Sequence, residues 1–158
     1  NVAAIPLLKK LTREGKTHLG LMHALWALAG MSALDWDTAE ASLSDPHEYV
    51  RSTALRVMEP LLAPEHEEDF LNALTDIWLA NDTEIVLQQA LLSLGELLFL
   101  TEDYFQMISE FLLSHAHPLA TTAALSSLNG RELEFLNYIF DHGKRPRTPT
   151  ILSDAASR

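Results

Sequence analysis

Histidine is the residue type in this chain best suited to bind a metal ion, and the sequence contains seven of them. The tightest pair is His115 and His117, which lie in a short segment between two apolar runs with no third ligand nearby. His18 and His23 are five residues apart, so a helix would place them on different faces. Neither pair matches the His-Glu-x-x-His spacing of zinc enzymes. We therefore interpret the histidines as surface or helix-capping residues and predict no metal and no cofactor.

Carboxylates could act as general acid and base, or bind calcium, where several of them converge. The densest acidic run, residues 65–69, lacks the spaced oxygen ligands and the loop glycine of a calcium site, and it suits the N-terminus of a helix. The pairs Asp35 with Asp37 and Glu132 with Glu134 have no neighbour in the sequence that would tune them for proton transfer. Motifs of serine hydrolases, phosphate loops and dinucleotide-binding folds are also absent. We predict that the chain is not an enzyme and has no catalytic residue.

Charge and composition narrow the classes of partner. The 158 residues carry a formal charge of −11. Residues 142–158 hold four basic residues and one acidic residue, so the remaining body is more acidic than the whole chain. Such a body repels a phosphate backbone, and we predict no nucleic-acid partner. No apolar run approaches the roughly 20 residues that span a bilayer, so we predict no membrane partner. The absence of cysteine excludes disulfides and thiolate metal sites within this segment.

An internal repeat predicts the elements that would position a binding surface. The dipeptide Ala-Leu begins at residues 24, 54, 90 and 124, with spacings of 30, 36 and 34 residues. Apolar or small residues recur four positions before and after each alanine, which makes one buried stripe on a helix. These flanking residues are Gly20, Val50, Val86 and Ala120 before the alanines, and Leu28, Met58, Leu94 and Leu128 after them. Spacings of this size are typical of helix-pair repeats.

A second apolar run precedes three of these helices and ends eleven residues before the alanine. Turn-forming residues separate the two runs, so each repeat is predicted to be two helices joined by a tight turn. The first helices are predicted near 3–13, 36–44, 67–80 and 102–114, and the second helices near 17–30, 47–62, 84–99 and 118–129. Pro60 predicts a kink within the second of these second helices.

The predicted fold is therefore all-α, a right-handed α-α superhelix of about four helix pairs with a C-terminal capping helix. Residues 1–141 would form this repeat domain, and residues 142–158 a flexible tail or linker. The repeats are expected near 1–30, 35–62, 66–99 and 101–130, with the cap at 131–141. The chain begins with Asn1-Val2-Ala3, without an initiator methionine or a signal peptide, and we interpret it as a fragment of a longer protein.

Residues 45–55, Asp-Pro-His-Glu-Tyr-Val-Arg-Ser-Thr-Ala-Leu, resemble the Asp-Pro-x-x-x-Val-Arg-x-x-Ala-Leu signature of HEAT repeats. The match covers one repeat in full, and the other three keep the apolar positions but lack the Val-Arg pair. In HEAT proteins the aspartate and arginine form a polar ladder along the stack. The resemblance implies these parts for Asp45 and Arg51.

A second resemblance rests on residues 23–30, on the Asp-Pro…Val-Arg unit and on Met58-Glu59-Pro60. These segments are similar to the HEAT region of large exported dehydrogenase-like proteins of planctomycetes and related bacteria, which also carry a β-propeller and a c-type cytochrome domain. This resemblance implies a bacterial protein with an exported or periplasmic location. It also implies that any redox chemistry belongs to other domains.

The repeat register predicts which side of the second helices is free to bind. Positions two before, two after and five after each alanine lie opposite the buried stripe, on the concave side of a solenoid. Trp26 and Arg56 are residue types that recognition surfaces favour, and Tyr49 flanks the same face. The predicted partner-binding residues are Met22, Trp26, Tyr49, Ser52, Arg56, Glu59, Gln88 and Leu92.

The pattern is compatible with three functions. The favoured function is a non-catalytic scaffold that binds a protein or a neighbouring domain of its own polypeptide. The alternative is a HEAT-like enzyme of the lyase or DNA-glycosylase type, which the acidic charge and the lack of a catalytic motif disfavour. The third is a regulatory solenoid that docks a metal or haem domain.

Overall fold

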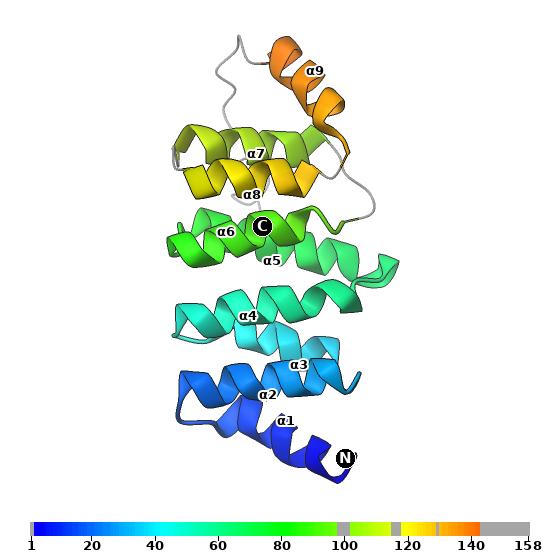
Figure 1. Cartoon of the computed structure of the whole chain (residues 1–158), viewed down its shortest axis with the longest axis vertical. Coiled ribbons are helices and arrows are strands. Elements are labelled where there is room, and N and C mark those ends of the chain that lie inside the picture. Colours follow the sequence, from blue (N-terminus) through cyan, green and yellow to red (C-terminus); the bar gives the residue numbers. More distant parts are fainter. Residues whose placement is uncertain (1, 98–101, 115–117, 129, 143–158) are drawn as a thin grey trace, which may run out of the picture. The chain divides into compact units, whose positions relative to one another are not determined.

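The computed structural model describes residues 2–97, 102–114, 118–128 and 130–142, and the regular elements in these ranges are helices (Figure 1). The predicted all-α class is confirmed. Contacts between Cα atoms group the chain into two compact units, residues 1–97 and residues 98–158, and each unit is described separately below. His115 and His117 lie outside the described residues, as does the predicted tail after His142.

The first unit consists of three helix pairs. In each pair the first helix packs against the second, and the second helices also pack on one another, α2 on α4 and α4 on α6. Figure 1 shows these pairs following one another along the unit. The first helices are α1 (Ile5–Glu14), α3 (Trp36–Ala41) and α5 (Glu67–Leu79), and the second helices are α2 (His18–Gly30), α4 (Glu48–Met58) and α6 (Glu84–Leu94).

The second unit contains α7 (Glu102–Ser114), α8 (Pro118–Leu128) and α9 (Glu132–His142). α7 packs against both α8 and α9. The buried Tyr104 hydroxyl donates a hydrogen bond to the Ser127 carbonyl, which ties α7 to α8. The Phe105 ring lies 5.7 Å from the rings of both Phe135 and Tyr138, which ties α7 to α9.

Every predicted helix range contains a helix, but three predicted ends lie well beyond the observed ones. α3 ends at Ala41, and residues 42–44 form a 3₁₀ turn, whereas the predicted range runs to residue 44. α4 ends at Met58, and residues 59–61 form a 3₁₀ turn, so the predicted kink at Pro60 is wrong and the α-helix stops there instead. Proline has no N–H, and its ring clashes with the carbonyl four residues earlier. α6 ends at Leu94 with Gly95 as its C-cap, although the sequence pattern predicted a helix to residue 99.

The predicted buried stripe forms the core of the second helices. Ala24, Leu25, Ala54 and Leu55 are fully buried, and Ala90 and Leu91 are nearly so. Leu125, at the position that corresponds to Leu25 and Leu55, is the exception, because 56% of its surface is exposed. α2 and α4 are each packed against the second helix of the next pair, whereas no such contact covers Leu125 within the described residues of the second unit.

Side-chain caps set where several of these helices begin. The Thr17 side chain accepts a hydrogen bond from the Gly20 N–H at the start of α2, and Asp35 accepts one of 2.9 Å from the Thr38 N–H at the start of α3. His47 caps α4 through its Nδ1 atom, which accepts the Tyr49 N–H. These caps satisfy amide groups that have no partner within the helix.

Candidate binding surface

The exposed side of α2, α4 and α6, called here the B face, carries the predicted binding residues. Trp26, Arg56 and Leu92 each follow the repeat alanine by two positions, so the packing of α2 on α4 and of α4 on α6 sets them in one row. The exposed fractions are 49% for Trp26 and 36% for Leu92, and the Arg56 side chain is 54% exposed. Two apolar side chains and a guanidinium are thus open to solvent on adjacent helices.

A second row of the B face lies five residues before each repeat alanine. Tyr49 belongs to this row and is 45% exposed, and Leu19, at the same position of α2, is 57% exposed. Ile85 occupies the position in α6 and is partly exposed. Sequence reasoning missed Leu19 and Ile85, although the same alanine register that selected Tyr49 would have found them.

The row two residues before each alanine is more closely packed. Met22, Ser52 and Gln88 are partly buried, so they lie between the exposed rows rather than projecting from the surface. Leu19, Met22 and Trp26 are spaced three and four residues apart on α2, and together they form an apolar stripe along that helix. The B face is therefore apolar at α2 and more mixed across α4.

Glu59 lies in a different environment from the other predicted binding residues. Its side chain is only 7% exposed, and it accepts hydrogen bonds from Ser93 Oγ at 2.8 Å and from Gln89 Nε2 at 3.2 Å. It also pairs with Arg56. Burial raises the pKa of the Glu59 carboxyl, and the Ser93 hydrogen bond and the Arg56 charge act in the opposite direction. Glu59 therefore links the end of α4 to α6, and we leave it out of the B face.

Aromatic rings gather where α2 and α4 begin. The rings of His18 and His47 are stacked with centroids 3.9 Å apart, and the Tyr49 ring lies 5.5 Å from that of His47. The Tyr49 N–H donates a hydrogen bond to His47 Nδ1. The cluster extends the B face toward the N-terminal ends of both helices. Its histidines are 29 residues apart, and no local spacing marks them as neighbours.

Arg51 connects two successive turns of the first unit. Its Nε and Nη2 atoms donate to both carboxylate oxygens of Asp82, the Nε bond being 2.8 Å long, and its Nη1 donates to the main-chain carbonyl of Asp45 at 2.8 Å. The Asp45 carboxylate accepts the His47 N–H instead. The ladder that the HEAT resemblance implies for Asp45 and Arg51 stays a prediction, and the carboxylate that pairs with Arg51 in the structure belongs to Asp82. Both side chains of this pair are mostly buried, so the contact is weakly screened.

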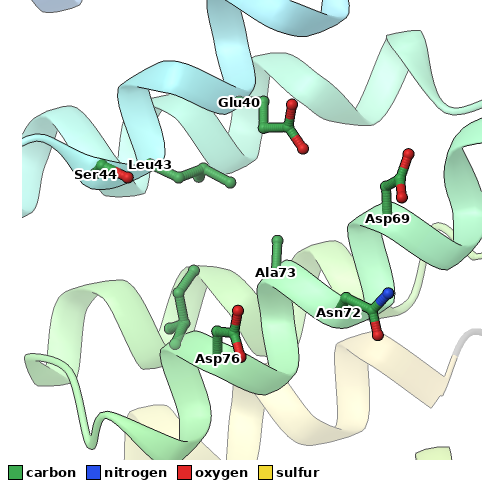
Figure 2. A pocket seen from close by; sticks show the side chains of 8 residues that line it. Glu40, Leu43, Ser44, Asp69, Asn72, Ala73 and Asp76 are labelled. Carbon is green, nitrogen blue, oxygen red and sulfur yellow. The ribbon is translucent and has the colours of Figure 1, made fainter. Parts of the chain in front are cut away.

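A cleft of about 340 Å³ lies between α3 with the 3₁₀ turn that follows it and α5, away from the predicted site (Figure 2). Its polar lining includes the carboxylates of Glu40, Asp69 and Asp76. Leu43 and Ile77 belong to its apolar lining.

The described residues contain no group of three or more histidine, aspartate or glutamate residues arranged to hold a metal ion. In the same part of the chain, no helix is both long and apolar enough to cross a membrane. The comparisons with known proteins found no matching family model, no matching curated protein and no matching solved structure.

Proposed function

We propose that this chain is a non-catalytic HEAT-like solenoid that binds a protein, or a neighbouring domain of its own polypeptide, through the B face. The observation that carries the proposal is the exposure of Leu19, Trp26, Tyr49 and Leu92 on helices that pack side by side. Large apolar side chains that recur on one face of adjacent elements are characteristic of interaction sites. Trp, Tyr and Arg are also the residue types most enriched among binding hot spots.

The helix pairing and the Arg51 contact support the solenoid part of the proposal. In the first unit α2 packs on α4 and α4 packs on α6, as the second helices of successive repeats do in repeat proteins. Arg51 joins the turn before α4 to the turn before α6, which is the position of a ladder contact between successive HEAT repeats. We extend the same repeat to α7 and α8, with α9 as the capping helix of a right-handed superhelix.

The B face is better suited to bind a protein than a nucleic acid. The lysine and arginine residues of α2, α4 and α6 are Arg51 and Arg56, and Arg51 is already paired with Asp82. A surface with one exposed guanidinium offers little positive charge to neutralise a phosphate backbone. Binding of duplex DNA at moderate salt would favour the DNA-glycosylase alternative over the scaffold.

The test is a pull-down in which the 158-residue chain is the bait. The variant combines Trp26→Ala with Arg56→Ala. We expect the wild-type chain to retain a partner whose crosslinks map to α2, α4 or α6, and the variant to lose at least about tenfold in affinity, since truncated hot-spot residues commonly cost 2 kcal/mol or more. Helical circular dichroism should be unchanged because both side chains are exposed.

The matched control combines Leu79→Ala with Asp76→Ala, which removes one exposed apolar and one exposed charged side chain from α5 instead. This control should bind as the wild type does. Equal binding by all three chains would show that the B face is not the site. A wild-type chain that retains no partner would count against the scaffold function itself.

A further inference from the structure

α1 exposes an apolar edge that faces away from α2. Leu7 is 70% exposed and Leu11 is 39% exposed, and the two residues are one helical turn apart. The partly buried Ile5 and Leu8 lie on the side of α1 that packs against α2. Lys10 and Arg13 are exposed beside the apolar edge, and Lys16 is exposed in the following turn. Glu14 is exposed on the same helix and pairs with Lys10 at 3.6 Å, so three basic residues stand against one carboxylate. This surface, called here the α1 edge, is apolar with a border that is basic on balance.

α9 exposes a second apolar edge, and its border has the opposite charge. Leu133 is 76% exposed, Leu136 is 48% exposed and Phe140 is 76% exposed. Their spacing of three and four residues places them in one stripe. Phe135, which packs toward α7, is on the other side of the helix and is 8% exposed. The stripe is bordered by three exposed carboxylates, and this surface is called here the α9 edge. The carboxylates belong to Glu132, Glu134 and Asp141.

The charges of the two edges decide which pairing is favourable. Two α1 edges in contact would bring their lysines and arginines together, and two α9 edges would bring their carboxylates together. An α1 edge against an α9 edge instead pairs apolar stripe with apolar stripe and basic border with acidic border. This pairing does not depend on how the two units of one chain are arranged, because each edge belongs to a single unit.

We infer that the partner of each edge is a second copy of this chain, bound head to tail with the α1 edge of one copy on the α9 edge of the next. Such a contact is heterologous, so each copy offers one edge of each kind and further copies can add. The two edges are separate from the B face, so self-association leaves the proposed partner surface available.

The experiment measures the mass of the 158-residue chain in solution by sedimentation from micromolar to millimolar concentration. The wild type should exceed twice the monomer mass of 17.6 kDa as concentration rises. Lys10→Glu combined with Arg13→Glu reverses two charges of the basic border and leaves Lys16. Glu134→Lys combined with Asp141→Lys reverses two charges of the acidic border and leaves Glu132. Each of these variants alone should stay monomeric, and Phe140→Ser should weaken association without a change of charge.

Mixing the two border variants distinguishes the head-to-tail contact from a symmetric one. The first variant keeps an intact α9 edge and the second keeps an intact α1 edge, so the mixture should form a pair of unlike chains and stop there. Glu65→Lys combined with Glu68→Lys makes the same change in net charge as the α9 variant, away from both edges, and should associate as the wild type does. Unchanged helical circular dichroism shows that each variant is folded.

Three results would overturn the inference. The first is a wild-type chain that remains monomeric over the whole concentration range. The second is loss of association in only one border variant, which would indicate a symmetric contact through a single edge. The third is loss of association in the Glu65→Lys, Glu68→Lys control, which would indicate a general effect of net charge.

Discussion

At the scale of single residues, equivalent positions of the repeat differ in what surrounds them. Leu55 and Leu125 both follow a repeat alanine, yet Leu55 is fully buried and Leu125 is 56% exposed. The sequence pattern treats the two leucines alike, because periodicity identifies the inward side of a helix but not whether another helix covers it. The exposure of Leu125 therefore could not be predicted from the sequence pattern.

Leu55→Ala should lower the free energy of unfolding by about 2–5 kcal/mol, because it removes a fully buried side chain and leaves a cavity. Leu125→Ala is the matched control and should change the free energy of unfolding by no more than about 0.5 kcal/mol. Urea denaturation followed by circular dichroism measures both values. A loss below about 1 kcal/mol for Leu55→Ala would mean that α4 is not packed as described.

Glu59 provides a prediction of pH dependence. Burial raises the pKa of its carboxyl above the ordinary value of 4.5, so the folded chain binds this proton more tightly than the unfolded chain does. The contribution of Glu59 to stability is therefore fully present below pH 4.5 and is lost as the pH rises through the raised pKa. Glu59→Gln removes this dependence.

The stability of Glu59→Gln relative to the wild type should therefore increase as the pH is raised from 4 to 7. Urea midpoints of the two chains, compared at each pH, measure the effect and cancel the other titrating groups. Glu48→Gln, at a residue of α4 outside this cluster, is the control and should show a smaller trend. A constant difference between Glu59→Gln and the wild type would show that the carboxyl is not desolvated.

At the scale of the elements, sequence patterns located the helices well and their ends less well. Apolar periodicity placed each helix because a buried stripe is a local property of the sequence. The ends of α4 and α6 depend on competition between continuing the helix and forming the next turn, which Pro60 and Gly95 decide. The hydrogen bonds of Glu59 to α6 could not be predicted, because they join residues 30 and 34 positions apart.

α3 is the shortest α-helix of the first unit, and its start depends on Asp35. The hydrogen bonds from the Lys9 ammonium and from Thr38 lower the pKa of Asp35 from 3.8 to about 2. The folded chain thus binds this proton less tightly than the unfolded chain does. The stabilisation is present above pH 3.8 and is lost as the pH falls toward about 2.

Asp35→Ala should destabilise the chain by about 1 kcal/mol at pH 7, because it removes the N-cap of α3. Asp35→Asn keeps a side-chain acceptor and should cost less, since the lost ion pair with Lys9 is partly exposed and worth about 0–1 kcal/mol. Thermal or urea unfolding of both variants separates the cap from the charge. If the two variants were equally destabilised, the charge rather than the cap would account for the effect.

At the scale of the whole molecule, the sequence predicted an all-helical chain with an internal repeat, and it predicted part of the candidate surface. Trp26, Arg56, Tyr49 and Leu92 are exposed on the helices where the alanine register placed them. The stacking of His18 on His47 could not be read from the sequence, because it requires the lateral packing of α2 on α4. The pairing of Asp82 with Arg51 could not be read from the sequence either, because it requires the turn that holds Asp82 to lie beside Arg51 in space.

α1 differs from the other helices of the first unit in that none of its residues is buried. It is attached to α2 by partly buried side chains, by the close approach of Gly15 to Leu21, and to α3 by the pair of Lys9 with Asp35. Detaching α1 leaves the fully buried residues of α4 undisturbed, so it requires less free energy than unfolding the unit. Amide hydrogens of α1 should therefore exchange with solvent through local opening, while those of α4 exchange through much rarer events. Any molecule that binds the α1 edge would then slow exchange mainly in this one helix.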